Sequence, residues 1–110
     1  MTADKTGAPT TVAAESDRFT IAVEGQAVGL AEFADRDGQR VFTHTEVADE
    51  FEGRGLATIL IGEALQATRD AGLRIVAVCP MVAAYVDKHD EFADVVDPVD
   101  HDIKRWLANP

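Results

Sequence analysis

The chain has little cysteine and little positive charge, and each shortage excludes a class of function. Its 110 residues include one cysteine, ten Lys and Arg against twenty Asp and Glu, and a net charge of -10, with a pI near 4.5. Nucleic acids are bound through clustered cations that release counterions, so these few scattered basic residues argue against a nucleic-acid partner. A lone cysteine cannot form a disulfide within the chain, and with three scattered histidines it makes no structural zinc pattern. We therefore expect no metal site.

Long apolar segments are absent as well. A membrane-spanning helix needs about 18 or more consecutive apolar residues, and the sequence has no such run. The first residues lack the basic and then apolar order of a secretory signal. We therefore expect a cytoplasmic protein with no membrane partner. A chain of this length has room for one domain with a single core.

The first half of the chain changes character near Arg18. Residues 1–16, "MTADKTGAPTTVAAES", mix Thr, Ala, Gly, Pro and acids without an apolar period, which predicts a disordered leader before a single domain over 17–110. Three apolar stretches follow, divided by "EGQ" and "DRDGQ", and such small polar residues favour tight antiparallel turns. The pattern predicts an antiparallel meander with strands at 18–23, 27–34 and 40–47.

The second half predicts a βαβ unit. From Gly55 to Ala71 the apolar residues recur on one face of a helix, and Gly72 is placed to end it. The segment "RIVAVC", residues 74–79, is short, continuous and rich in β-branched residues, as in a strand buried on both faces and parallel to strand 40–47. The fold class is therefore α+β.

Two further segments complete the predicted domain. Pro80 can occupy the first turn of a second helix, in which apolar residues continue at helical spacing as Val82, Tyr85 and Val86. The tail "DPVDHDIKRWLANP" contains a short amphipathic piece, whose predicted docking residues are Ile103, Trp106 and Leu107.

A glycine-rich turn, "EGRG", stands where the first predicted helix begins. The first turn of a helix presents unpaired N–H groups and the positive end of the helix dipole, which together favour phosphate or pyrophosphate. Gly53 and Gly55 would let phosphate oxygens approach the backbone, and Arg54 would add a cation. The alternative is that the glycines only make a tight connection. The P-loop and dinucleotide-binding patterns are both missing.

A longer pattern is more specific. The segment "HTEVADEFEGRGLATILIGEAL", followed by "GLRIVAVCP" and "AAYVDKHDEF", resembles the GNAT superfamily of acyl-CoA N-acetyltransferases. Within it, the chain is similar to small single-domain proteins that carry H-T-E-V, E-G-x-G-x-A and C-P. The resemblance covers about residues 18–97. One position departs from the family pattern, because Glu52 stands where Gln or Arg is usual.

The resemblance implies a fold, a cofactor and a binding site. It implies a GNAT-like α+β domain whose parallel strand pair splays apart, and acetyl-CoA as the cofactor. The backbone of Val47 would pair with the pantetheine arm in that gap. The pyrophosphate would be held by the amides of the glycine turn and the first helical turn, from Gly53, Arg54, Gly55, Leu56, Ala57 and Thr58.

The catalytic candidates are four residues. The resemblance implies that Tyr85 protonates the departing thiolate, although a core tyrosine fits its apolar stripe equally well. His44 and Glu46 are spaced to share one strand face, where either could be the general base, and a solvated strand face is the alternative. Cys79 precedes a helix start, where a thiolate is favoured and could accept an acyl group. A buried cysteine that only fills space is its alternative.

The first predicted turn also bears on the acceptor. A full GNAT domain has helices after its first strand that cover the acceptor site, whereas "VEGQAV" turns at once into the next strand. The resemblance therefore implies an open acceptor site and an acetyl-CoA-dependent N-acetyltransferase that acts on an amine of a small molecule or protein, directly or through Cys79. The alternatives are a non-catalytic acyl-CoA-binding module and a small interaction domain with a degenerate coenzyme site.

Overall fold

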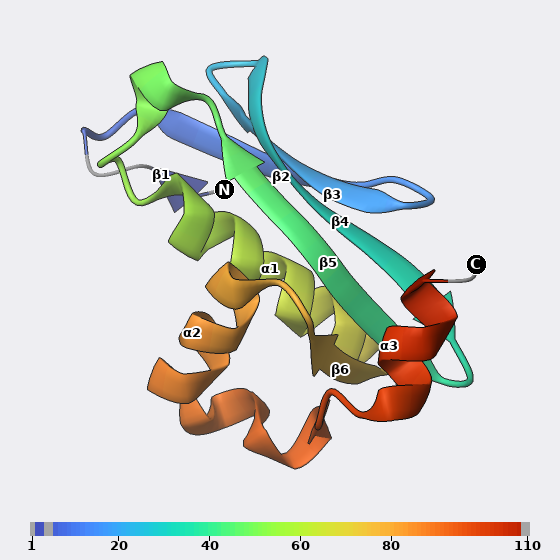
Figure 1. Ribbon diagram of the computed structural model, residues 1–110. Helices are drawn as coiled ribbons and strands as arrows, with labels where there is room; N and C mark the ends of the chain where they lie inside the picture. Colours follow the sequence, from blue (N-terminus) through green and yellow to red (C-terminus); the bar gives the residue numbers. More distant parts are fainter. Residues whose placement is uncertain (1, 4–5, 109–110) are drawn as a thin grey trace.

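The computed structural model describes residues 2–3 and 6–108, which form one seven-stranded sheet with three α-helices (Figure 1). The strands lie side by side in chain order, antiparallel from the first to the fifth and parallel for the last two pairs. Their bounds are β1 Thr2–Ala3, β2 Pro9–Ala14, β3 Arg18–Val23, β4 Gln26–Arg36, β5 Gln39–Val47, β6 Arg74–Ala77 and β7 Val96–Asp97. The helices are α1 Leu56–Asp70, α2 Pro80–Lys88 and α3 His101–Ala108, with 3₁₀ turns η1 Asp49–Phe51 and η2 Asp90–Val95.

The two faces of the sheet are covered unequally. On one face, Phe19, Phe33 and Phe42 form an aromatic cluster that packs in a single apolar core with the buried side of α1. On the other face, Val41 and Val76 pack with Ile103 of α3. Figure 1 shows α3 against the lower end of the sheet only. The upper part of that second face is therefore left without a helix.

Most predicted elements are confirmed. The three strands of the meander lie within one to two residues of their predicted bounds, and α1 ends where Gly72 adopts a φ of +76°, a conformation that favours glycine. Pro80 is the first residue of α2. In the tail, Ile103 is 1% exposed, with Trp106 and Leu107 packed beside it.

The predicted disordered leader is wrong for residues 9–14. These residues form β2, which pairs with β3 through Thr10↔Val23 and Val12↔Ile21. Thr10 is buried and Val12 packs against the core, while Thr11 and Ala13 are exposed. The sequence does alternate with a period of two, but its inward positions are small or polar, so the burial comes from pairing with β3. The rest of the leader prediction includes residues 1, 4 and 5, which lie outside the described residues.

No helix in the described part of the chain is long and apolar enough to cross a membrane.

Helices α1 and α2 meet at a glycine. The hydroxyl of Tyr85 lies 2.7 Å from the position that a Cβ at Gly62 would occupy, and the ring carbon that carries it lies 3.5 Å away. A side chain at Gly62 would therefore collide with the hydroxyl oxygen but not with the ring.

We predict that Gly62→Ala and Tyr85→Phe are coupled. In the Tyr85→Phe background, Gly62→Ala should raise the free energy of unfolding by about 0.5–1 kcal/mol, because Ala is the better helix former. In the wild type the same change should stabilise less or destabilise. Urea unfolding of both single variants and the double variant measures the coupling, and additivity within about 0.5 kcal/mol would contradict it.

Candidate functional site

The edge of β5 is open along its second half. Pairing between β5 and β6 runs from Gln39↔Arg74 to Phe42↔Ala77, and the amides of Val78 and Cys79 then both donate to the Phe42 carbonyl at 3.1 and 2.8 Å. Strand β5 continues to Val47 without a partner on that side in the described part of the chain. This is the splayed strand pair that the sequence resemblance implied.

The backbone of Val47 faces the open edge. The amide of Ala48 donates to the Val28 carbonyl in β4 at 2.8 Å. Backbone groups along a strand point alternately to its two neighbours, so those of Val47 and Thr45 point away from β4. An extended chain could therefore form hydrogen bonds with β5 at this edge.

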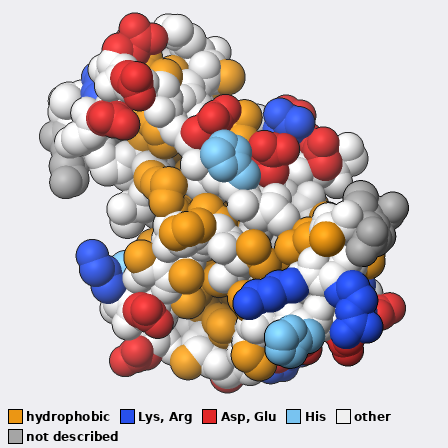
Figure 2. Space-filling model, viewed as in Figure 1, with side chains coloured by type: hydrophobic (Ala, Val, Ile, Leu, Met, Phe, Trp, Pro, Cys, Tyr) orange, Lys and Arg blue, Asp and Glu red, His pale blue; other side chains and the backbone are white. Residues whose placement is uncertain are grey.

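A cleft of about 650 Å³ lies beside this edge. It extends from the end of β5 past η1 to the glycine turn and the first turn of α1, with Met81 of α2 on its far side. Figure 2 shows apolar side chains exposed over α1 and α2 next to acidic side chains at the upper end of the molecule. The cleft is lined by Thr45, Glu46, Val47, Asp49, Phe51, Glu52, Gly53, Gly55, Leu56, Ala57, Thr58 and Met81.

The glycine turn opens α1 without a side-chain cap. Gly53 and Gly55 have φ values of +81° and +78°, in the left-handed region that glycine tolerates best. Gly55 is the N-cap, no side chain caps it, and the first helical bond runs from the Ile59 amide to the Gly55 carbonyl. The amides of Leu56, Ala57 and Thr58 are therefore left without helical acceptors at the wall of the cleft, where they favour an anion.

The charges around this anion-favouring turn are negative. Glu46, Asp49 and Glu52 line the cleft. The Arg54 guanidinium lies 4.9 Å from the centre of the Phe51 ring and donates to Thr6 Oγ1 at 3.1 Å. Arg54 is thus part of the turn, but it is not among the residues that line the cleft.

His44 and Glu46 lie on the helix-free face of the sheet. Opposite β4, the pairing shifts so that Phe33 pairs with Phe42 and Glu32 with His44, which makes Thr43 an extra residue, as in a β-bulge. His44 Nε2 and Glu46 Oε2 are 3.2 Å apart, and both side chains are more than half exposed. The predicted sharing of a face therefore agrees with this geometry.

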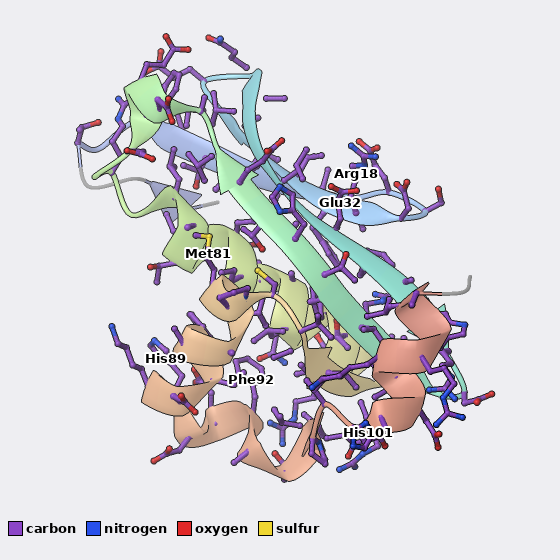
Figure 3. All side chains as sticks on the ribbon, in the orientation of Figure 1. Arg18, Glu32, Met81, His89, Phe92 and His101 are labelled. Atoms are coloured by element: carbon purple, nitrogen blue, oxygen red, sulfur yellow. The ribbon has the colours of Figure 1, made fainter. Side chains whose placement is uncertain are left out.

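Glu46 lies where two cavities meet. A second cavity, of about 530 Å³, is lined by residues of β3, β4 and β5 and shares Glu46, Val47 and Asp49 with the cleft. Figure 3 shows Arg18 and Glu32 side by side on the same helix-free face, at the positions paired across β3 and β4. A molecule could thus reach the end of β5 from the side opposite α1.

Cys79 is buried one side chain behind the cleft. It is 3% exposed, belongs to the main core, and its thiol donates to Thr45 Oγ1 at 3.4 Å. Thr45 lines the cleft and Cys79 does not. Sequence reasoning did not identify Thr45, because simple alternation from Phe42 would turn it outward. The bulge at Thr43 turns it inward.

Tyr85 is not among the residues that line the cleft at the open edge of β5. Its ring stacks on His89 with 4.0 Å between centroids, and its hydroxyl lies over Gly62. Burial, followed by the charge of Glu91, raises the pKa of Tyr85, so the hydroxyl keeps its proton at neutral pH.

Tyr85 and His89 line a third cavity, of about 240 Å³, between α1 and α2. This cavity shares Ala57, Thr58 and Met81 with the cleft, so the two are neighbours across these residues. Figure 3 shows Met81 on α2, His89 directly after the end of this helix and Phe92 in the segment that follows. Met81, which is 41% exposed, lines both cavities, and no sequence pattern predicts this role.

Within residues 2–3 and 6–108, no group of three or more His, Cys, Asp or Glu residues is arranged so that it could hold a metal ion.

Sequence and fold both resemble known proteins. A family model described as GCN5-related N-acetyl-transferase matches residues 18–95. In structure, the chain is similar to a GCN5-like protein from Staphylococcus aureus solved by NMR in solution, with a TM-score of 0.63 and 25% identity; the match covers 83% of this chain and 91% of that one. No curated protein matches the sequence significantly. Because the family model covers well over half of the chain and the fold agrees with it, the chain belongs to the GCN5-related N-acetyltransferase family.

Proposed function

We propose that this protein is an acetyl-CoA-dependent N-acetyltransferase that passes the acetyl group directly to an amine of a small molecule or protein. The observation that carries the proposal is one cleft that joins the open edge of β5 to the uncapped start of α1. These are the two features that a pantetheine arm and a pyrophosphate need, namely backbone groups for an extended amide chain and free N–H groups for an anion. We also propose that the protein is located in the cytoplasm.

The three cavities suggest how the substrates would be held. Backbone groups of Val47 would pair with the pantetheine arm, and the turn from Gly53 to Thr58 would bind the pyrophosphate. The cavity between α1 and α2 would take the adenosine end, where the Tyr85 and His89 rings offer flat surfaces for a base. The cleft and this cavity share Ala57, Thr58 and Met81, so the coenzyme could extend from the β5 edge to α2.

The acceptor amine would enter from the helix-free face. Glu46 adjoins both cavities at the end of β5, so its carboxylate is within reach of an amine that approaches the thioester from that side. His44, hydrogen-bonded to Glu46 at 3.2 Å, would orient the carboxylate or accept the proton from it. The exposure of this face suits a protein terminus, a side chain or a small amine.

Two other functions remain as alternatives. A non-catalytic acyl-CoA-binding module is favoured by the position of Tyr85, whose hydroxyl lies over Gly62 and which does not line the cleft. A small interaction domain with a degenerate coenzyme site is favoured by the acidic cleft lining, Glu52 above all. Failure to bind acetyl-CoA in calorimetry would leave only the interaction domain, and binding without acetylation of any amine in a panel would favour the binding module.

The anion site can be tested without altering the glycines, whose positive φ would strain any other residue. Thr58 is exposed, is the third residue of α1 and lines the cleft. Thr58→Glu should weaken acetyl-CoA affinity at least about tenfold, because a carboxylate near the pyrophosphate repels it by roughly 1 kcal/mol or more. The melting temperature should not fall, since Glu is favourable in the first turn of a helix. Thr58→Gln is the neutral control, and equal affinities of the two variants in calorimetry would refute this site.

The general base can be tested at Glu46. Glu46→Gln should lower kcat about 100-fold with the KM for acetyl-CoA unchanged, because proton removal by a positioned base contributes roughly 10²–10⁴-fold. Steady-state release of coenzyme thiol with a reactive amine measures both constants. Glu32→Gln removes a carboxylate from the same face as a control, and an equal loss in the two variants would show only a general effect of charge.

Direct transfer and an acyl-enzyme predict different masses. The burial of Cys79 and its absence from the cleft wall favour direct transfer. We therefore expect no acetyl adduct in intact-protein mass spectra after incubation with acetyl-CoA. An adduct that appears in the wild type and is lost in Cys79→Ala would instead establish the cysteine acyl-enzyme.

A further inference from the structure

Thr45 and Cys79 form a buried polar pair at the wall of the cleft. Thr45 is 6% exposed and Cys79 is 3% exposed, in surroundings that are otherwise apolar. The thiol donates to the Thr45 hydroxyl oxygen with 3.4 Å between Sγ and Oγ1. Because only Thr45 also lines the cleft, its hydroxyl stands between the thiol and whatever the cleft holds.

Thr45 and Cys79 together carry two hydrogens that can be donated but form only one hydrogen bond within the described part of the chain. The thiol and the hydroxyl each carry a hydrogen, and a single hydrogen bond joins them. No other acceptor meets this pair among the residues that the structure describes. Two other threonines behave differently, since the Thr43 hydroxyl donates to the Glu32 carbonyl and the Thr68 hydroxyl to the Ala64 carbonyl.

An unsatisfied donor that is nine-tenths buried is costly, by about 1–3 kcal/mol. Buried polar groups are therefore nearly always paired, and an exception calls for an explanation. Thr45 lines the cleft, so a ligand in the cleft can reach its hydroxyl. The spare O–H thus indicates that a ligand group with lone pairs belongs beside Thr45.

The position of Thr45 along β5 identifies which ligand group this is. Strand residues rise about 3.3 Å each, so Thr45 lies roughly 7 Å further from the glycine turn than Val47 does, on the same face. A pantetheine arm that begins at that turn and pairs with Val47 would reach Thr45 with its far end, which carries the thioester sulfur. This step depends on the function proposed above.

We propose that Thr45 protonates the departing sulfur, with Cys79 supplying the proton behind it. The amine nitrogen attacks the thioester carbonyl carbon, the C–N bond forms, the C–S bond breaks, and its electron pair goes to sulfur. The Thr45 hydroxyl proton moves to that sulfur while the Cys79 thiol proton moves to Thr45 Oγ1. The amine proton leaves through Glu46 to water, and the Cys79 thiolate regains a proton from water after the products depart. Over the whole cycle, one proton passes from the amine to the coenzyme thiol.

This role differs from that of a buried cysteine nucleophile. Sulfur at Cys79 would not bond to carbon at any stage, and Thr45 would be the catalytic residue that touches the substrate. It also differs from a purely structural role, because removal of the hydroxyl should change a proton-transfer step and leave coenzyme binding intact.

The test compares Thr45→Val, which has nearly the same shape without the hydroxyl, with Thr45→Ser, which keeps it. We expect Thr45→Val to lower kcat about 100-fold with the KM for acetyl-CoA within about twofold, and Thr45→Ser to restore most of the rate. The solvent deuterium isotope effect on kcat should exceed about 2 in the wild type and be smaller in Thr45→Val, where the relayed proton is missing and only the proton transfer to Glu46 remains. Thr43→Val, which alters a neighbouring hydroxyl that already has a backbone acceptor, should keep the wild-type rate and isotope effect.

The outcomes separate this inference from the function on which it depends. A wild-type protein that neither binds acetyl-CoA in calorimetry nor acetylates any amine in the panel would remove the proposed function. A wild-type protein that turns over, beside a Thr45→Val variant with unchanged kcat and isotope effect, would overturn the role of Thr45 alone. Thermal melting of each variant shows whether a lost rate comes from unfolding, and recovery by Thr45→Ser then decides for the hydroxyl.

Discussion

The carbonyl of Phe42 is the point on which the site depends. It accepts the amides of both Val78 and Cys79, and the next residue, Pro80, has no amide with which to continue the ladder. Parallel pairing therefore stops there, although β5 runs on to Val47. A carbonyl that accepts two amides, followed by a proline, thus leaves the second half of β5 with an open edge inside the sheet.

The bulge at Thr43, one residue further along, gives each face of that edge its chemistry. Because the bulge reverses the alternation, Thr45 and Val47 turn toward α1 and the cleft, while His44 and Glu46 turn toward the helix-free face. A hydroxyl and a thiol therefore lie on the side where a thioester would enter, and a carboxylate lies where an amine would approach. With strict alternation, the two sets of groups would exchange faces.

The sequence predicts the architecture better than the site. Helical and strand periods identify the meander, α1 and β6 because burial there follows the pattern of large apolar residues. The strand at 9–14 escapes prediction because its inward residues are Thr and Val among small neighbours, and pairing with β3 decides its structure. The direction of Arg54 toward Phe51 and Thr6, and of Tyr85 toward Gly62, depends on contacts between distant segments that no local pattern records.

The altered end of α2 bears on the same chemistry. In the pattern of the family that the chain resembles, the tyrosine begins the sequence Y-x-x-x-G-F, whereas here Tyr85 begins a longer "YVDKHDEF". Tyr85 stacks on His89, and its hydroxyl lies close to Gly62. Tyr85 does not line the cleft at the open edge of β5, so a departing thiolate there would need another acid. The donor that the cleft wall does present, buried and with a hydrogen to spare, is the hydroxyl of Thr45. The position of the Tyr85 hydroxyl and the spare hydrogen of the Thr45 hydroxyl are therefore both consistent with the proposal that the acid lies on β5 and not on α2.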